Sequence, residues 1–522
     1  MRSLYSPTLH FTLIVSLGGF IFGFDASVIS GAIGFIDKAF GLTEWQQGFV
    51  VSSPTLGALI AMLGAGIISD RIGRRKTLII IAVLYLISAI CSALAFNYWM
   101  LVAARFIGGM AFCSLIIAPV YISEISAPEH RGKMVSVNQL NIVFGFALSY
   151  FSNYYFLQLS QSQWAWVKEI GIAHHPWRFM LGMEVIPAAL WLLLLFTIPR
   201  SPRWLMLKKC TKEAEQVVKQ LFTPARAQQQ LQSIQASLDQ QNGHWKPRFS
   251  LLLRSGMRFP LILGLILAVS QQITGINVIF FYAPTIFEQS GVGTNAAFMQ
   301  AIWVGIINVF FTIVAMACID RWGRKPLLIT GLGGVIVSMA VCAYGFAQAQ
   351  YQLNMPSVIE LNGMSDVVLS KLHLLQNQVF DSDVVFKQAL LTALGEHDYD
   401  KFNADILSVS ISMNAPLVLL GIMAFVASYA ISLGPVMWAM LAEIFPNQTR
   451  ALAISMVGVI NSLTSFLVQF LFPWELMHVG AAATFAIYGA FAVVSLVLVL
   501  TLFPETKGRT LEQIGQQLQS KT

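Results

Sequence analysis

Twelve long apolar stretches divide this 522-residue chain and limit its fold more than any other feature of the sequence. Each holds about twenty residues, the length that an α-helix needs to cross the hydrocarbon of a bilayer. Only 11% of the residues are charged, whereas a soluble protein carries about 25%. The sequence therefore predicts an all-α membrane protein with twelve transmembrane helices. The expected spans lie near residues 9–31, 47–69, 77–96, 99–121, 134–156, 177–198, 258–283, 298–319, 326–348, 413–441, 451–473 and 480–503.

The spans fall into two sets of six, separated by a polar segment. This segment is rich in Lys, Glu, Gln and Ala between Leu207 and Leu238, a composition that favours short helices. A second polar stretch interrupts the later set, and we interpret it as an exoplasmic insertion to which the sequence assigns no role. The predicted divisions are a six-helix bundle at 1–199, a cytoplasmic helical linker at 200–257, a second six-helix bundle at 258–503 with the insertion at 349–412, and a cytoplasmic tail at 504–522.

The distribution of basic residues predicts the orientation. Lys and Arg accumulate on the cytoplasmic side of membrane proteins, and with the N-terminus inside, cytoplasmic segments hold 25 of the 32 such residues. We therefore expect a multi-pass protein of the cell (inner or plasma) membrane, with both termini cytoplasmic and the lipid bilayer as its surroundings. The net charge of +7 then calls for no nucleic acid partner. The first span continues past Gly31 without a signal-peptide cleavage site, so we expect it to remain in place.

Short charged loops recur at matching places in the two halves. The pattern Asp-Arg-x-Gly-Arg-Arg/Lys occurs at 70–75 and 320–325, and a Glu stands seven residues before an Arg after both the fourth and the tenth span. Carboxylates and guanidiniums at such helix ends can pair across the halves, hold the cytoplasmic side shut and separate when it opens. The alternative is a topology signal alone, because inner loops collect Arg. The residues of this predicted cytoplasmic gate are Asp70, Gly73, Arg74, Arg75, Glu124, Arg131, Asp320, Gly323, Arg324, Glu443 and Arg450.

Together with these repeats, five further motifs resemble the sugar porter branch of the major facilitator superfamily. The resemblance covers nearly the whole chain apart from the insertion. It implies the major facilitator fold, with two pseudo-symmetric six-helix bundles, alternating access and one sugar site between the bundles near the midplane. Arg200 departs from the branch, which usually has a glutamate of the cytoplasmic charge network there. The motifs are Pro-x-Ser-Pro-Arg-Trp-Leu at 199–205, Gln-Gln-x-x-Gly-x-Asn at 271–277, Gly-Pro-x-x-Trp at 434–438, Glu-Ile-Phe-Pro at 443–446 and Pro-Glu-Thr-Lys-Gly at 504–508.

Three neutral amides, Gln271, Gln272 and Asn277, lie together in the seventh span. Unpaired amides are costly in a membrane helix, so this group indicates a wet cavity, and amides both donate to and accept from solute hydroxyls. On an ideal helix their directions spread over about 240°, too wide for one ligand. Gly275 and Pro284 predict a broken helix that lets the three converge. Hydrogen bonding between helices is the alternative role.

The resemblance implies further residues of the solute site. Trp438 matches a stacking indole, whereas hydrogen bonding between helices is an equal alternative for Gln139 and Asn461. Phe146 and Ser462 stand where xylose and glucose carriers commonly have Gln and Trp, so the solute stays open among hexose, pentose and cyclic polyol. The implied solute-binding residues are Phe22, Gln139, Gln271, Gln272, Asn277, Tyr282, Gly434, Trp438 and Asn461.

Two charged residues lie within apolar spans, Asp25 in the first and Arg105 in the fourth. A charge at the bilayer centre costs about 2.5–3.5 kcal/mol on insertion scales, so we expect the two to pair. A pair that opens and closes lets Asp25 bind and release a proton, whereas a permanent pair only locks the helices. By resemblance, Asp25 and Arg105 match the coupling pair of bacterial xylose–proton symporters, and Glu184 matches an acid near that pair.

These observations favour a secondary transporter that moves a sugar or polyol with a proton and functions as a monomer. A passive facilitator and a non-transporting sugar sensor are the alternatives. No nucleophile–base pairing, metal-ligand cluster or nucleotide loop stands out in the sequence. We therefore expect neither an enzyme nor a metal or cofactor.

Overall fold

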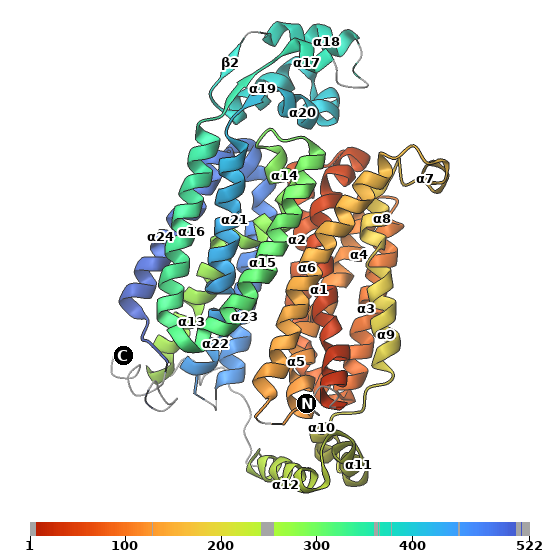
Figure 1. Ribbon diagram of the computed structural model, residues 1–522, viewed down its shortest axis with the longest axis vertical. Coiled ribbons are helices and arrows are strands. Elements are labelled where there is room, and N and C mark those ends of the chain that lie inside the picture. Colours follow the sequence, from red (N-terminus) through yellow and green to blue (C-terminus); the bar gives the residue numbers. More distant parts are fainter. Residues whose placement is uncertain are drawn as a thin grey trace.

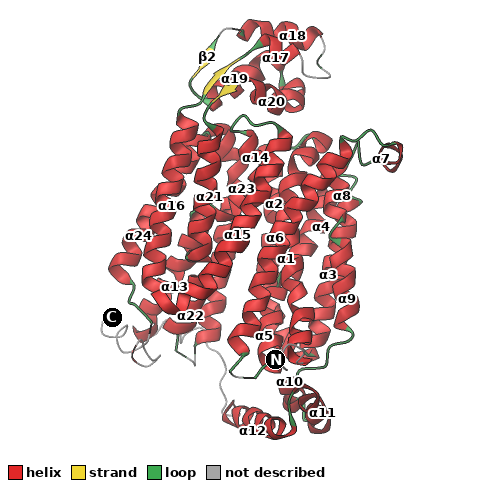
Figure 2. Ribbon diagram, in the orientation of Figure 1, coloured by secondary structure: helices red, strands yellow, loops and turns green. Residues whose placement is uncertain are grey.

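The computed structural model describes residues 7–127, 129–241, 255–359, 364, 366–376, 378–446, 449–507 and 513. Within these ranges twelve helices are long and apolar enough to cross a membrane, which confirms the predicted spans. Figures 1 and 2 show them as two upright bundles standing side by side. The chain is a multi-pass membrane protein.

The first bundle contains six spans, two of which are broken. α4 and α5 form one span interrupted at Phe112 and Cys113, and α8 and α9 form another interrupted at Met183 and Glu184. Its helices are α1 (Pro7–Phe40), α2 (Glu44–Ile72), α3 (Arg74–Ala93), α4 (Tyr98–Ala111), α5 (Ser114–Ile125), α6 (Arg131–Ser160), α8 (Pro176–Gly182) and α9 (Val185–Leu195), with the short α7 (Ala165–Ile170) between spans.

The second bundle repeats this plan, and its first span breaks where the sequence predicts. Gly275 has φ +86°, a left-handed conformation that favours glycine. A Cβ atom there would lie 2.6 Å from the ring of Tyr488, so the position has no room for a side chain. The helices are α13 (Ser255–Ile273), α14 (Ile276–Glu288), α15 (Thr294–Trp322), α16 (Arg324–Ala347), α21 (Ala415–Ile431), α22 (Leu433–Ile444), α23 (Arg450–His478) and α24 (Ala481–Leu502).

Three short helices follow the first bundle, as predicted for the linker. They are α10 (Pro202–Leu207), α11 (Thr211–Leu221) and α12 (Pro224–Gln241). They lie at the end of the molecule where α1 begins and α24 ends (Figure 1). We call this end the linker side.

Residues 350–412 form a compact unit at the opposite end, which we call the cap (Figure 1). Its own core includes Tyr351, Phe386, Leu390 and Ile406. A three-stranded sheet of order β2-β1-β3 joins its ends, with β1 antiparallel to both neighbours. The sequence predicted no strand, because these strands of two or three residues are too short to show alternation. The elements are β1 (Gln350–Gln352), α17 (Met355–Ile359), α18 (Asp366–Leu372), η2 (His373–Leu375), β2 (Val379–Phe380), α19 (Asp383–Leu394), α20 (Glu396–Ser410) and β3 (Ile411–Ser412).

The two bundles touch tightly on the cap side. α2 packs against α23 so closely that a Cβ atom at Gly48 would lie 2.1 Å from the carbonyl oxygen of Phe470. The hydroxyl of Tyr150 on α6 donates to the carbonyl oxygen of Phe280 on α14 at 2.7 Å. The bundles are therefore closed against each other on the cap side.

We predict that Gly48→Leu separates the bundles on the cap side. Overpacking of a close contact costs about 1–3 kcal/mol, and the backbone of Phe470 cannot move aside as a side chain can. Gln158 donates to Asn295 across the bundles at 2.9 Å, so cysteines at these two positions report on closure. A short thiol cross-linker should join them efficiently in the parent chain and poorly with Gly48→Leu.

Gly66→Leu is the matched control, because Gly66 is also on α2 and a Cβ atom there meets no described atom within 4 Å. Its cross-linking yield should equal that of the parent. Equal yields for both leucine variants, in protein that elutes normally in size exclusion, would contradict the closure described here.

Candidate functional site

The predicted amides of the seventh span meet in one hydrogen-bonded network with Asn461 of α23. Gln272 Nε2 donates to Asn461 Oδ1 at 3.1 Å, and Asn277 Nδ2 donates to Gln272 Oε1 at 2.8 Å. Asn461 Nδ2 in turn donates to Gln271 Oε1 at 2.9 Å. The break at Gly275 brings Gln272 and Asn277 together, although they are five residues apart. The structure thus assembles four of the predicted residues at one place.

Two further polar residues extend this network and were missed from the sequence. Asn277 Nδ2 also donates to Ser465 Oγ at 2.7 Å, and Gln469 Nε2 donates to the same hydroxyl at 2.6 Å. Thr55 of α2 then donates to Gln469 Oε1 at 3.3 Å, which links the network to the first bundle. Asn461, Ser465 and Gln469 recur every four residues and so share one face of α23. That spacing is the sequence signal that could have found them.

Two residues of α22, Leu433 and Met437, contact the network, and each precedes a predicted residue in the sequence. Gln271 Nε2 donates to the carbonyl oxygen of Leu433 at 3.2 Å, beside Gly434. Met437 Sδ lies 3.9 Å from Asn461 Nδ2, and the following residue, Trp438, leaves 48% of its surface exposed. The stacking role of this half-exposed indole stays a prediction.

The remaining predicted solute residues have different surroundings. Tyr282 is buried, and its hydroxyl donates to the carbonyl oxygen of Gln469 at 3.1 Å. Phe22 is half-buried in edge-to-face contact with Phe112, with ring centroids 4.6 Å apart. Gln139 is exposed on α6, and no hydrogen bond among the described residues joins it to the amide network. The roles of these three residues stay predictions.

Asp25 and Arg105 form a buried ion pair inside the first bundle, as the cost of isolated charges requires. Their exposed fractions are 1% and 2%, and the guanidinium also donates to the Asp25 carbonyl oxygen at 3.2 Å. Glu184, 2% exposed, lies beside the pair, close enough for its carboxyl to interact with Asp25. The structure brings together all three predicted coupling residues.

This charged cluster is incompletely satisfied. Within the described part of the chain, Asp25 Oδ2, Arg105 Nε and Glu184 Oε1 have no hydrogen-bond partner. Gly108 leaves room for them, because a Cβ atom there would lie 3.2 Å from Asp25 Oδ2. Unmet hydrogen-bonding groups in a buried cluster are costly. They leave the cluster able to accept a proton or a water molecule.

The gate residues of the first half form an ionic cluster on the linker side. Arg74 pairs with Asp70 at 2.7 Å and with Glu124 at 3.1 Å, and Arg131 donates to the carbonyl oxygen of Ser123 at 3.1 Å. Gly73, with φ +94°, makes the tight turn between α2 and α3. Arg75 donates to the carbonyl oxygens of Leu195 and Phe196 of the sixth span.

The second half repeats this arrangement. Arg324 pairs with Glu443 at 2.8 Å, Arg450 donates to the carbonyl oxygen of Phe445 at 3.1 Å, and Gly323 makes the turn with φ +95°. The Asp320 side chain lies outside the described residues. The ion pairs of Arg74 with Asp70 and Glu124, and of Arg324 with Glu443, each connect residues of a single bundle. Pairing across the halves therefore stays a prediction.

The two halves differ at one position, which holds an acidic residue only in the second half. Glu505 accepts hydrogen bonds from the backbone N–H groups of Arg324 and Lys325, at 3.2 and 3.0 Å, and so caps the start of α16. The equivalent position of the first half holds Arg200, which instead pairs with Glu213 of α11 at 3.3 Å. The departure noted in the sequence thus attaches the end of the first bundle to the linker.

The described residues contain no group of three or more His, Cys, Asp or Glu that could hold a metal ion. What the site offers is neutral hydrogen-bonding groups in one bundle and a carboxyl–guanidinium cluster in the other. Such a site can bind a polar solute and a proton.

Comparison with known proteins gives consistent matches over nearly the full length. A family model described as "Sugar (and other) transporter" matches residues 11–361 and 401–518, leaving out much of the cap. The arabinose-proton symporter of Bacillus subtilis (strain 168) is 30% identical over 98% of this chain and 95% of its own length. The D-xylose-proton symporter of Escherichia coli (strain K12) is 31% identical over 98% and 96%. The inward-open structure of the E. coli xylose transporter matches with TM-score 0.72 and 29% identity, over 98% of this chain and 99% of that one.

We predict that Arg105→Leu lowers the free energy of unfolding by about 3–5 kcal/mol, the usual effect of removing one partner of a buried ion pair. The loss should shrink as the pH falls, because protonated carboxyls need no guanidinium. Lys219→Leu is the control, since it removes the exposed partner of Glu215 and should cost less than about 1 kcal/mol. Denaturant unfolding in detergent measures both. Equal losses in the two variants would contradict the buried pair.

Proposed function

The chain belongs to the sugar porter family of the major facilitator superfamily, and on that premise we propose that it carries a sugar or polyol across the membrane together with a proton. Family membership makes it a transporter and not an enzyme. The observation that carries the proposal is the network of Gln271, Gln272, Asn277 and Asn461 at a broken helix. The exposed Trp438 follows Met437, which contacts this network.

The network suits a polyhydroxylated solute for a physical reason. Its amides are bonded to one another, so solute hydroxyls can replace those bonds with little net change in hydrogen bonding. Binding then stays weak enough for release, which a carrier requires. The indole of Trp438 supplies a surface for the apolar face of a sugar ring. Both clusters lie in one chain, which supports a monomeric carrier.

We propose that the linker side is cytoplasmic and the cap exoplasmic, with the protein in the inner or plasma membrane. The distribution of Lys and Arg supports this orientation. The contacts at Gly48 and Tyr150 close the cap side, and we propose that the amide network is open toward the cytoplasm in this state. When the bundles move to the opposite state, these contacts would break and the linker-side ionic clusters of the two bundles would come together.

The cluster of Asp25, Arg105 and Glu184 is the proposed proton site. Two carboxyls beside one guanidinium leave one excess negative charge, and a single bound proton removes it. In the state described here Asp25 is paired with Arg105, as expected after proton release to the cytoplasm. Movement of α1 against α4 in the opposite state would separate the pair and leave Asp25 to bind a proton.

We predict that Gln272→Ala weakens solute binding about tenfold while the protein stays folded. The substitution removes an amide that would bond to a solute hydroxyl, and one such hydrogen bond contributes about 1–1.5 kcal/mol to the free energy of binding. Equilibrium binding of radiolabelled D-xylose, L-arabinose and D-glucose to purified protein measures the effect. Gln229→Ala, on the exposed face of α12, should leave affinity unchanged. Unchanged affinity in Gln272→Ala would place the solute elsewhere.

We predict that Asp25→Asn abolishes uphill accumulation but preserves exchange of solute across vesicle membranes, because the amide cannot carry the proton. In the parent chain each imposed pH unit should drive about tenfold accumulation for one proton per solute. The same substitution at the exposed Asp366 of the cap serves as control. Uptake in the parent that only equilibrates the solute, whatever pH gradient is imposed, would identify a passive facilitator.

A further inference from the structure

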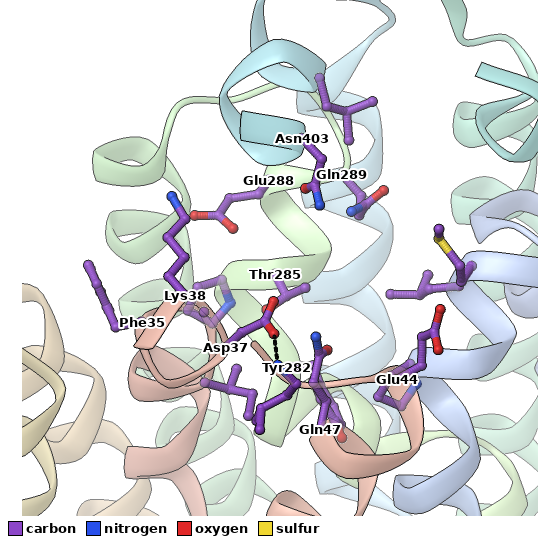
Figure 3. A pocket seen from close by; sticks show the side chains of 18 of the residues that line it. Phe35, Asp37, Lys38, Glu44, Gln47, Tyr282, Thr285, Glu288, Gln289 and Asn403 are labelled. Atoms are coloured by element: carbon purple, nitrogen blue, oxygen red, sulfur yellow. Dashed lines mark hydrogen bonds between the residues drawn. The ribbon is translucent and has the colours of Figure 1, made fainter. Parts of the chain in front are cut away.

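A second cavity lies between the cap and the bundles, apart from the amide network. Its volume is about 500 Å³, within the usual range of small-molecule sites. Its walls come from the cap-side ends of α1, α2, α14 and α23 and from the cap helices α19 and α20. Figure 3 shows labelled side chains of α1, α2, α14 and α20 around one shared space. The cavity therefore combines both bundles and the cap.

The cap half of the cavity is fixed to the second bundle. Lys387 of α19 is buried, pairs with Asp383 at 3.2 Å and donates to the carbonyl oxygen of Leu476 on α23 at 3.2 Å. Asp383 also accepts from the backbone N–H of Ala481 at the start of α24. Burial lowers the pKa of Lys387, and the charge of Asp383 partly offsets this effect. The cap must therefore move with the second bundle.

Neutral polar side chains without partners face this cavity. Gln47 of α2, Gln289 of α14 and Asn403 of α20 all line it, together with the hydroxyl-bearing Thr285. None of the three amide side chains has a hydrogen-bond partner among the described residues, and each is half-buried. In Figure 3, Asn403 and Gln289 approach the space from one side and Gln47 from another. Half-buried amides that lack partners favour a ligand that supplies hydroxyls.

Acidic and basic side chains also line the cavity. Asp37, Glu44 and Glu288 oppose Lys38 and Lys387, and Asp37 accepts from the backbone N–H of Leu42 at 3.2 Å. Lys387 is already paired with Asp383, so the acids outnumber the remaining base and the wall disfavours an anion. The half-buried amides favour a neutral solute that supplies hydroxyls.

Two aromatic residues of the cavity wall, Tyr282 and Phe472, connect it to the amide network. Tyr282 and Phe472 line the cavity, and their ring centroids are 4.9 Å apart. On its other side Tyr282 bonds to the carbonyl oxygen of Gln469, whose side chain bonds to Ser465 of the network. One aromatic layer therefore separates the two places.

We propose that the cavity beneath the cap is an outer binding site for the same neutral sugar or polyol, which the solute occupies before it passes the aromatic layer to the amide network. This inference rests on the proposed function. Asn403 and Gln289 belong to one moving body and Gln47 to the other, so the site changes its width as the bundles alternate. The cap is then part of the transport path and not a loop expansion without a role.

The test places a cysteine in the outer site and asks whether sugar shields it. Asn403→Cys is reconstituted in vesicles and labelled from outside with a membrane-impermeant maleimide, with the unsubstituted chain as background. We expect whichever of D-xylose, L-arabinose or D-glucose is taken up to slow labelling about fivefold at about four times its Kd, because only about one fifth of the sites are then unoccupied. Gln388→Cys, on the exposed face of α19, should label at the same rate with and without sugar.

The second arm repeats the labelling in a Gln272→Ala background, where the inner network is weakened. Protection of Asn403→Cys at an unchanged sugar concentration supports a separate outer site. Protection that disappears with Gln272→Ala, or labelling that ignores sugar while uptake continues, would overturn the inference and leave the proposed function standing. Failure of the unsubstituted chain to take up any of the three sugars would overturn both.

Discussion

The hydrocarbon of a bilayer offers no hydrogen-bond partners, so each buried polar group of this chain must find one inside the protein or remain unmet at a cost. Most spans avoid the problem by being apolar. Polar side chains gather instead in two places, the amide network around Gln272 and the charged cluster around Asp25. Each place also includes residues at an interruption of a helix, Gly275 in the first and Glu184 in the second. In an intact helix the backbone groups hydrogen-bond to one another and the side chains point in fixed directions. A break at Gly275, or at Met183 and Glu184, changes the directions of the neighbouring side chains.

The sequence predicted the spans and the linker well because both depend on local properties. Span length and apolar content are read residue by residue, and the Gly275 break follows from a glycine next to amides that a straight helix would scatter. The Asp25–Arg105 pair was predictable for an energetic reason, since neither charge is tolerable alone. At these positions the free-energy cost of scattered amides or of an unpaired charge leaves few alternative structures.

Other features depend on contacts between distant segments, which no local pattern reveals. Ser465 and Gln469 look like ordinary polar residues of a span until the fold sets them beside Asn277 and Thr55. The strands of the cap are too short for alternation to show, and its core forms only when residues as far apart as Tyr351 and Ile406 meet. Gln139 shows the opposite difficulty. A glutamine side chain suits a solute site, but no hydrogen bond joins Gln139 to the described amides of the network. Its role therefore stays a prediction.

The two halves share a plan but divide the chemistry. The charged cluster lies in the first bundle and the amide network in the second, so any coupling of proton to solute must cross the interface between them. Two of the links across this interface run from Thr55 to Gln469 and from Tyr150 to the Phe280 carbonyl, and the first ends in the amide network itself. Both belong to the contacts that close the cap side. Because these links break when that side opens, the amide network and the Asp25 pair can respond to one rearrangement without touching each other, which is the requirement of coupled transport.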